Sequence, residues 1–281
     1  MNIKYFYDKE TKTFSYVVFD KEGGNGIVID SVLSFNVKSG KFTYDLADEI
    51  INFLIVNKIK LDWILETHAH ADHVTAAQYI KSKCGGKVAI HENIKIVQDT
   101  FSKLFNIDDM IENNYYFDYF LKDKEIINAG ALVIEIIHIP GHTPACSAFK
   151  IDNNIFVGDT IFMPDVGSAR CDFPGGNAET LFDSVQKILS YDKDTNLYMC
   201  HDYPNSRELQ FKTTIQYEIS NNIHFKNKTK SEFIEMRNSR DKTLDVPNLL
   251  IPSIQINIRA GHFPPVDDNG IAYLKIPINL F

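Results

Sequence analysis

Four short apolar runs in this chain each lead to a histidine or an aspartate. They are LDWILET (61–67) before His68, LVIEIIHI (132–139) before His142, NIFVGD ending at Asp159, and NLYMC (196–200) before His201. Runs this short and apolar predict buried strands. Because open α/β sheets bind their ligands at the carboxyl ends of strands, we expect these polar side chains to gather at one edge of an α/β fold.

The first of these positions, HAHADH, has the most histidine and aspartate side chains. It supplies His68, His70, Asp72 and His73 within six residues. Imidazole and carboxylate groups are ligands of zinc and iron. A chance cluster on a solvated loop is the alternative, but the whole chain has nine histidines and three of them fall in this run. We therefore predict a catalytic site for one or two transition-metal ions, with Asp72 and His73 taking part in the chemistry as well as in metal binding.

His142, Asp159 and His201 are weaker candidates when each is taken singly. A histidine at a strand end is more often structural, and an aspartate after a glycine can belong to a turn. Their positions after apolar runs make them the expected remainder of the ligand set. The other histidines lack such a position and are interpreted as structural: His91, His138, His224 and His262.

The charge and hydropathy of the chain argue against several other classes of protein. A formal net charge of −8, with acidic residues spread along the chain, argues against a nucleic-acid binder. No apolar run approaches the roughly 20 residues that cross a bilayer, so no membrane partner is expected. The N-terminal residues lack the apolar segment of a secretory signal. We expect a cytoplasmic protein whose four cysteines are reduced and buried.

We expect one domain over residues 1–281, in which residues 206–281 are an extension of the same domain. Apolar spacing and an acidic first turn predict a helix over residues 43–58, and two more helices are expected over 206–221 and 231–241. A further helix is expected directly after HAHADH, closed by Gly85 and Gly86.

The order HAHADH, PGHTPAC, VGDTIF and MCHDY resembles the metallo-β-lactamase superfamily. The resemblance covers roughly residues 13–281 and implies an αββα sandwich, in which two mixed β-sheets face each other between helices, with a helical C-terminal extension. Glyoxalase II enzymes and persulfide dioxygenases of this superfamily both carry these motifs. The segments MPDVGSARCDFPGG (163–176) and LLIPSIQINIRAGHFPPVDDNGIAYLKIP (249–277) resemble the bacterial persulfide dioxygenase branch.

This resemblance implies two alternative metal centres. In glyoxalase II two ions, bridged by an aspartate, are held by the residues that match His68, His70, Asp72, His73, His142, Asp159 and His201. In persulfide dioxygenases one iron is held by the residues that match His68, His142 and Asp159, a triad that leaves positions open for substrate and O2. All seven residues are present, so the ligand set leaves both centres open. The two branch-specific segments favour one Fe(II) per chain, with zinc as the alternative.

The favoured branch implies that glutathione persulfide and O2 are converted to sulfite and glutathione, in sulfide detoxification. Arg170, Tyr203 and Arg259 are the expected substrate-binding residues. Arg170 matches an arginine near the active site of such relatives, Tyr203 lies just after His201, and Arg259 lies in the tail that builds part of their substrate pocket. A structural contact is the alternative for each. A zinc-dependent thioester hydrolase is the second expectation, and a metal or persulfide sensor without turnover is the third. The resemblance also suggests a homodimer.

Overall fold

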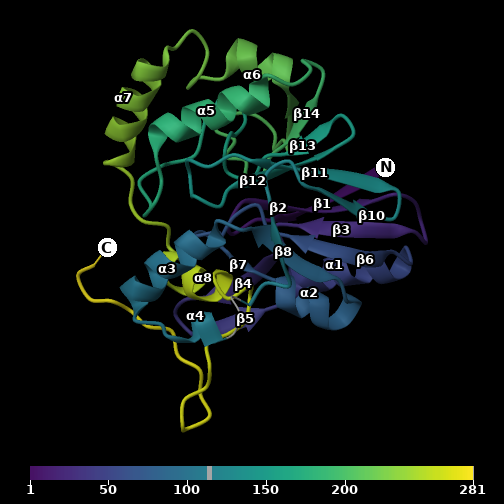
Figure 1. The fold of residues 1–281 in the computed structure, drawn as a ribbon, viewed down its shortest axis with the longest axis vertical. Helices are drawn as coiled ribbons and strands as arrows, with labels where there is room; N and C mark the ends of the chain where they lie inside the picture. Colours follow the sequence, from purple (N-terminus) through teal and green to yellow (C-terminus); the bar gives the residue numbers. More distant parts are fainter. Residues whose placement is uncertain (113–115, 281) are drawn as a thin grey trace.

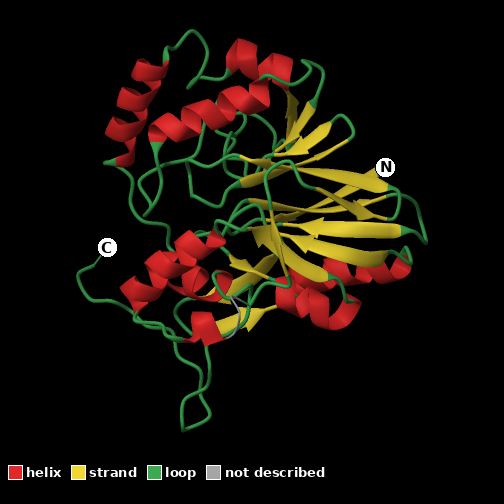
Figure 2. Ribbon diagram, in the orientation of Figure 1, coloured by secondary structure: helices red, strands yellow, loops and turns green. Residues whose placement is uncertain are grey.

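The computed structural model describes residues 1–112 and 116–280, where two six-stranded sheets face each other between two groups of helices (Figure 1, Figure 2). The first sheet contains, in spatial order, β1 (Asn2–Asp8), β2 (Thr13–Phe19), β3 (Asn25–Ile29), β6 (Lys60–Leu65), β8 (Lys87–His91) and β9 (Tyr119–Leu121). Its first three strands are antiparallel and the remaining pairs are parallel. The predicted αββα sandwich of two mixed sheets is confirmed.

The second sheet contains, in spatial order, β10 (Ile126–Ala129), β11 (Leu132–His138), β12 (Ser147–Ile151), β13 (Asn154–Phe156), β14 (Asn196–Tyr198) and β15 (Lys212–Thr214). Strands β11 and β13 are both antiparallel to β12, and β14 is parallel to β13. The carboxyl ends of β11, β13 and β14 therefore lie at the same edge of this sheet. A small third sheet joins β5 (Lys41–Thr43), β4 (Val32–Asn36) and β7 (Val74–Thr75).

The helices form the two outer layers of the sandwich. The first sheet is covered by α1 (Asp45–Val56), α2 (Ala77–Cys84), α3 (Ile94–Phe105) and α8 (Leu250–Asn257), whose apolar residues share one core cluster with it. The second sheet is covered by α5 (Ala178–Leu189), α6 (Ile215–Asn221) and α7 (Lys230–Asp241). A short helix, α4, spans Asp109–Glu112. The helices of residues 206–281 are thus divided between the two outer layers, as Figure 1 shows.

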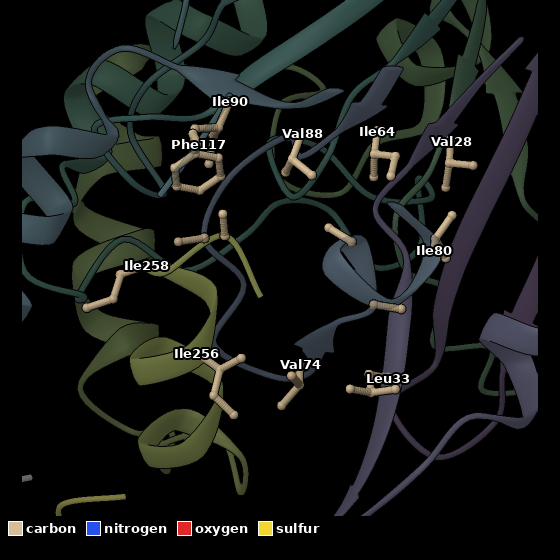
Figure 3. Close-up of a cluster of buried hydrophobic side chains, with 14 of the residues drawn as sticks. Val28, Leu33, Ile64, Val74, Ile80, Val88, Ile90, Phe117, Ile256 and Ile258 are labelled. Carbon is tan, nitrogen blue, oxygen red and sulfur yellow. The ribbon is translucent and has the colours of Figure 1, made fainter. Parts of the chain in front are cut away.

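The alternation of side chains along the strands produces three core layers. Ile27 and Ile29 of β3 pack between the two sheets, whereas Val28 points to the helices on the other face. This alternation is the period of two that a strand buried on both faces requires. Figure 3 shows the layer between the first sheet and its helices, where Val28 and Ile64 from the strands lie in the same cluster as Ile256 from α8. Helix α8 is therefore part of the main core.

One predicted helix is wrong at its start. The chain over 206–211 is irregular, Lys212–Thr214 form β15 at the edge of the second sheet, and α6 begins only at Ile215. The Thr214 hydroxyl accepts a hydrogen bond from the Tyr217 amide (3.3 Å) and so fixes the first turn of α6 at this position. The other predicted helices are confirmed with shorter or nearly equal bounds, as α1, α2 and α7. No helix in the described ranges is long and apolar enough to cross a membrane.

Candidate metal centre

The structure brings all seven predicted ligands together at the edge where the two sheets meet. We call residues 68–75 the metal loop; it follows β6, ends with β7 and carries His68, His70, Asp72 and His73. The remaining ligands come from the second sheet, where His142 follows β11, Asp159 follows β13 and His201 follows β14. Each ligand lies beyond the end of its strand, so the expectation that the strand itself ends at Asp159 is wrong: β13 ends at Phe156.

The seven ligands form two adjacent groups. One nitrogen or oxygen atom from each of His68, His142 and Asp159 lies within 4.8 Å of the others, and the same holds for His70, Asp72, His73 and His201. Asp159 faces both groups: its Oδ2 atom lies 3.7 Å from Nε2 of His68, and its Oδ1 atom lies 3.3 Å from Nε2 of His201. This carboxylate therefore sits between the two groups.

Two glycines allow the loops to approach closely enough for this convergence. Gly158 precedes Asp159 and has φ +54°, and a side chain there would meet the Thr67 hydroxyl at 2.7 Å. Gly141 precedes His142 with φ +138°, and a side chain there would meet the backbone of Leu181 at 2.4 Å. Only glycine fits both the backbone conformation and the available space at these positions.

A chain of hydrogen bonds fixes the rings of His68 and His70. The Thr67 hydroxyl donates to Oδ2 of the buried Asp30 (2.9 Å), so its oxygen accepts from Nδ1–H of His68 (3.0 Å). Oδ1 of the same carboxylate accepts from the Thr67 amide (2.8 Å) and from Nε2–H of His70 (3.1 Å). Because the outer nitrogen of each ring donates, the lone pair of the inner nitrogen is free to bind a metal ion.

The other three rings are oriented in the same way. Nδ1 of His142 donates to the Arg170 carbonyl oxygen (2.8 Å), and Nδ1 of His201 donates to the Lys12 carbonyl oxygen (3.2 Å). Nδ1 of His73 lies 3.4 Å from Oδ1 of Asp72. All five imidazoles therefore present Nε2 or, for His70, Nδ1 to the interior of the centre.

The nitrogen and oxygen atoms that point into the centre indicate whether these residues could hold a metal ion. Six of them are buried and have no hydrogen-bond partner within the described ranges: Nε2 of His68, Nδ1 of His70, Oδ2 of Asp72, Nε2 of His73, Oδ1 of Asp159 and Nε2 of His201. Buried polar atoms without a partner cost free energy, and a cation bound by either group would satisfy the atoms that face it. This nitrogen and carboxylate donor set suits zinc or ferrous iron.

The protonation of His68, His70 and Asp72 also suits metal binding. Burial and the neighbouring His70 ring hold the pKa of His68 well below its usual value, and burial with His73 does the same for the pKa of His70. Burial opposes ionisation of Asp72, but His201 and His73 outweigh it and hold the pKa of this carboxyl well below its usual range. Neutral imidazoles and ionised carboxylates are the forms that bind metals.

A cavity of about 430 Å³ opens on the centre and includes Asp72, His142 and Asp159 in its wall. Tyr203 also lines it, and its ring stacks on the His201 ring at a centroid distance of 5.9 Å. Burial and the nearby Asp72 raise the pKa of the Tyr203 hydroxyl, so this group remains a hydrogen-bond donor. Arg240 of α7 is exposed and lines the same cavity. The sequence analysis did not single out Arg240.

Arg170 and Arg259, the other predicted substrate-binding residues, are held by protein groups. Arg170 lines the cavity, but its guanidinium group donates to both Asp172 oxygens (2.6 and 2.7 Å) and to the Asp245 carbonyl oxygen (2.7 Å). Arg259 is buried, forms a two-fold ion pair with Asp109 (2.6 and 2.8 Å) and is not in the cavity wall. The geometry therefore gives Arg170 an indirect role, through its carbonyl group on His142, and gives Arg259 a structural one.

The cysteines occupy different positions relative to the centre. Cys146, Cys171 and Cys200 are buried, and Cys84 is half-buried. The Cys200 sulfur lies within 4.8 Å of ligand atoms of Asp159 and His201. Burial and the nearby Asp30 raise the pKa of this thiol well above its usual value.

Asp30 is the main functional residue that the sequence analysis missed. It follows the apolar run GIVI of β3, so it shows the same strand-end pattern as the ligands. That pattern could have identified Asp30 as a candidate site residue. It could not have shown that Asp30 is a hydrogen-bond partner of the ligands and not a ligand itself.

Comparisons with known proteins agree with this geometry. Residues 9–201 match the family model described as the metallo-beta-lactamase superfamily. "Glyoxylase B2" of Dictyostelium discoideum is 45% identical, with 99% of this chain and 97% of that protein aligned, and a "Probable metallo-hydrolase" of Burkholderia pseudomallei is 44% identical over 99% of both chains. The crystal structure of ETHE1 from Myxococcus xanthus shares the fold, with a TM-score of 0.76 and 23% identity over 93% of this chain and 100% of that one. The chain therefore belongs to the metallo-beta-lactamase superfamily.

Proposed function

We propose that the chain is a persulfide dioxygenase, which uses O2 to oxidise glutathione persulfide to sulfite and glutathione, in sulfide detoxification. The observation that carries the proposal is the separate group formed by His68, His142 and Asp159. Two histidines and one carboxylate are the ligand set of non-haem iron oxygenases, and they leave positions open for substrate and O2. His142 and Asp159 line the cavity, so these positions would face incoming substrate.

Ferrous iron, when bound by this triad, would supply the activation of O2. The reaction balances without an external reductant, because the outer sulfur loses four electrons on becoming sulfite and O2 accepts four. One water molecule supplies the third oxygen atom of sulfite, and the carrier thiol is released as glutathione.

The protein residues would bind and orient the substrate. Apolar side chains of the cavity, including Phe162 and Leu244, would contact the body of the thiol and exclude bulk water. The exposed guanidinium group of Arg240 would bind a glutathione carboxylate. The Tyr203 hydroxyl and the His70, Asp72 and His73 groups would orient the persulfide and water.

The resemblance of residues 163–176 and 249–277 to the persulfide dioxygenase branch supports the same choice. The test combines metal analysis with an oxygen electrode. Protein purified anaerobically should contain about one iron per chain, and addition of glutathione persulfide should cause O2 uptake with matching release of sulfite. Nearly two zinc ions per chain, with no O2 uptake after reconstitution with iron, would overturn the proposal.

A zinc-dependent thioester hydrolase is the second candidate, and one observation favours it. The Asp159 carboxylate has one oxygen towards each ligand group, as a carboxylate that bridges two ions would. Two ions held in this way would activate a water molecule for attack on an acyl carbon. Hydrolysis of an acyl-glutathione thioester by the two-zinc form, in the same preparation that fails to consume O2, would establish this candidate instead.

A further inference from the structure

Asn257, the last residue of α8, makes three hydrogen bonds to the backbone of the metal loop. Its Oδ1 atom accepts from the Thr75 amide (2.9 Å), and its Nδ2 atom donates to the carbonyl oxygens of His70 and His73 (2.8 Å each). The side chain is buried, and both of its amide protons are used. A single carboxamide from α8 therefore holds the metal loop on both sides of Asp72.

We infer that Asn257 is a positioning residue of the metal centre. By fixing the carbonyl groups of His70 and His73, it sets where their rings and the intervening Asp72 carboxylate point, and so keeps these ligand atoms close to His201. The inference rests on the proposed metal centre but not on the reaction that the centre catalyses. No other side chain in the described ranges is recorded as a hydrogen-bond donor to these two carbonyl groups.

Helix α8 is itself held by other parts of the chain. Gln255 donates to the carbonyl oxygens of Ile251 and Lys275 (2.9 Å each) and accepts from the Lys275 amide (2.9 Å). Gln98 of α3 donates to the Ile258 carbonyl oxygen (2.7 Å). Figure 1 shows α8 beside α3 on the side of the first sheet. Metal binding should therefore stabilise α8, and an intact α8 should strengthen metal binding, because coupling between two sites is reciprocal.

The test measures Co²⁺ binding by metal-free protein and uses Gln255 as a matched control. Asn257→Ala and Gln255→Ala each remove three hydrogen bonds from buried side chains of the same helix, so a general loss of stability affects both. We expect Asn257→Ala to weaken Co²⁺ affinity by about 10- to 100-fold and to change the visible absorption of the bound ion, since residues that orient ligands have effects of this size. Gln255→Ala, which leaves the three hydrogen bonds from Asn257 to the metal loop in place, should have a much smaller effect on both.

Asn257→Asp is the second variant, because it keeps the acceptor for Thr75 but removes both donors. It should weaken Co²⁺ binding as Asn257→Ala does. Equal affinities in the wild type and both Asn257 variants, or an equal loss in Gln255→Ala, would show that Asn257 is merely structural.

A measurement on the wild type avoids dependence on how the variants fold. Hydrogen exchange should slow in residues 250–257 when Co²⁺ binds, by more than in α5, which belongs to the opposite layer. Unchanged exchange in 250–257 would contradict the inference. Failure of the proposed oxidation would look different, because Co²⁺ binding would remain dependent on Asn257 while persulfide caused no O2 uptake in the iron form.

Discussion

The Oδ1 atom of Asp159 lies 3.3 Å from Nε2 of His201. The other oxygen of the same carboxylate faces His68, so Asp159 is shared by both ligand groups while His201 belongs to one. The two residues should therefore respond differently to substitution, and the difference reports how many ions the centre uses.

Asp159→Ala should abolish iron binding and O2 uptake, because it removes a ligand of the proposed triad. His201→Ala should retain nearly one iron per chain with reduced activity, because His201 lies outside that triad. Metal content by mass spectrometry and O2 uptake check both variants, with a loss in iron affinity of more than about 100-fold expected for Asp159→Ala. Loss of one of two bound ions in His201→Ala, together with loss of thioester hydrolysis, would point to the two-metal centre.

Arg240→Met should raise KM for glutathione persulfide by about 10-fold with little change in kcat, because a hydrogen bond to a charged group contributes about 1.5 kcal/mol or more. The residue is exposed in the cavity wall and no ion pair to it is recorded within the described ranges. Lys242→Met is the matched control, since this exposed cation follows α7 but is not in the cavity wall. An equal change of KM in the two variants would contradict a specific role for Arg240.

Arg259→Met should lower the free energy of unfolding by about 3 kcal/mol, because breaking a buried ion pair leaves Asp109 without its charged partner. KM for the persulfide should not change, since Arg259 is not in the cavity wall. Denaturant unfolding and steady-state kinetics check the two parts. The double variant with Asp109→Leu should recover part of the lost stability. A raised KM in Arg259→Met would instead indicate that Arg259 contributes to substrate binding.

Glu218 of α6 is buried, and burial raises its pKa to about 8. An unfolded glutamate has a pKa of about 4.3. Between these values the folded protein keeps a proton that the unfolded chain loses, so Glu218 should lower the free energy of unfolding by up to about 1.4 kcal/mol for each pH unit as pH rises, with no further change above about pH 8.

Glu218→Gln should remove this dependence and make the protein more stable than the wild type near pH 8. Unfolding of metal-free protein at several pH values measures the effect. The exposed Glu235 provides the control variant, Glu235→Gln, which should follow the wild-type pH dependence. Parallel curves for the wild type and Glu218→Gln would show that Glu218 is ionised in the folded state.

The candidate metal ligands could be predicted because four of them lie just beyond apolar runs and the other three follow His68 within five residues, and both patterns are visible in the sequence. The hydrogen-bond partners of these ligands could not, since Arg170 and Lys12 act through backbone carbonyl groups, which any residue carries. Asn257 is equally hidden, because 182 residues separate it from Thr75 and only the packing of α8 brings them together.

Local patterns also failed where edge pairing decided the structure. The stretch 206–221 was expected to be helical throughout. Instead, Lys212–Thr214 pair with β14, which precedes His201 in the chain, and the residues of 206–221 alone do not show this partner. The roles expected of Arg170 and Arg259 rested on the resemblance to relatives, and a resemblance does not show whether a carboxylate partner such as Asp172 or Asp109 lies within reach.

The position of Asn257 in the chain has a consequence for biosynthesis. Every ligand of the centre, from His68 to His201, leaves the ribosome before α8 is made. While the nascent polypeptide emerges, the metal loop lacks the carboxamide that later holds it. The centre should therefore reach its full metal affinity only after α8 has been made and has docked on the metal loop, among the last steps of assembly.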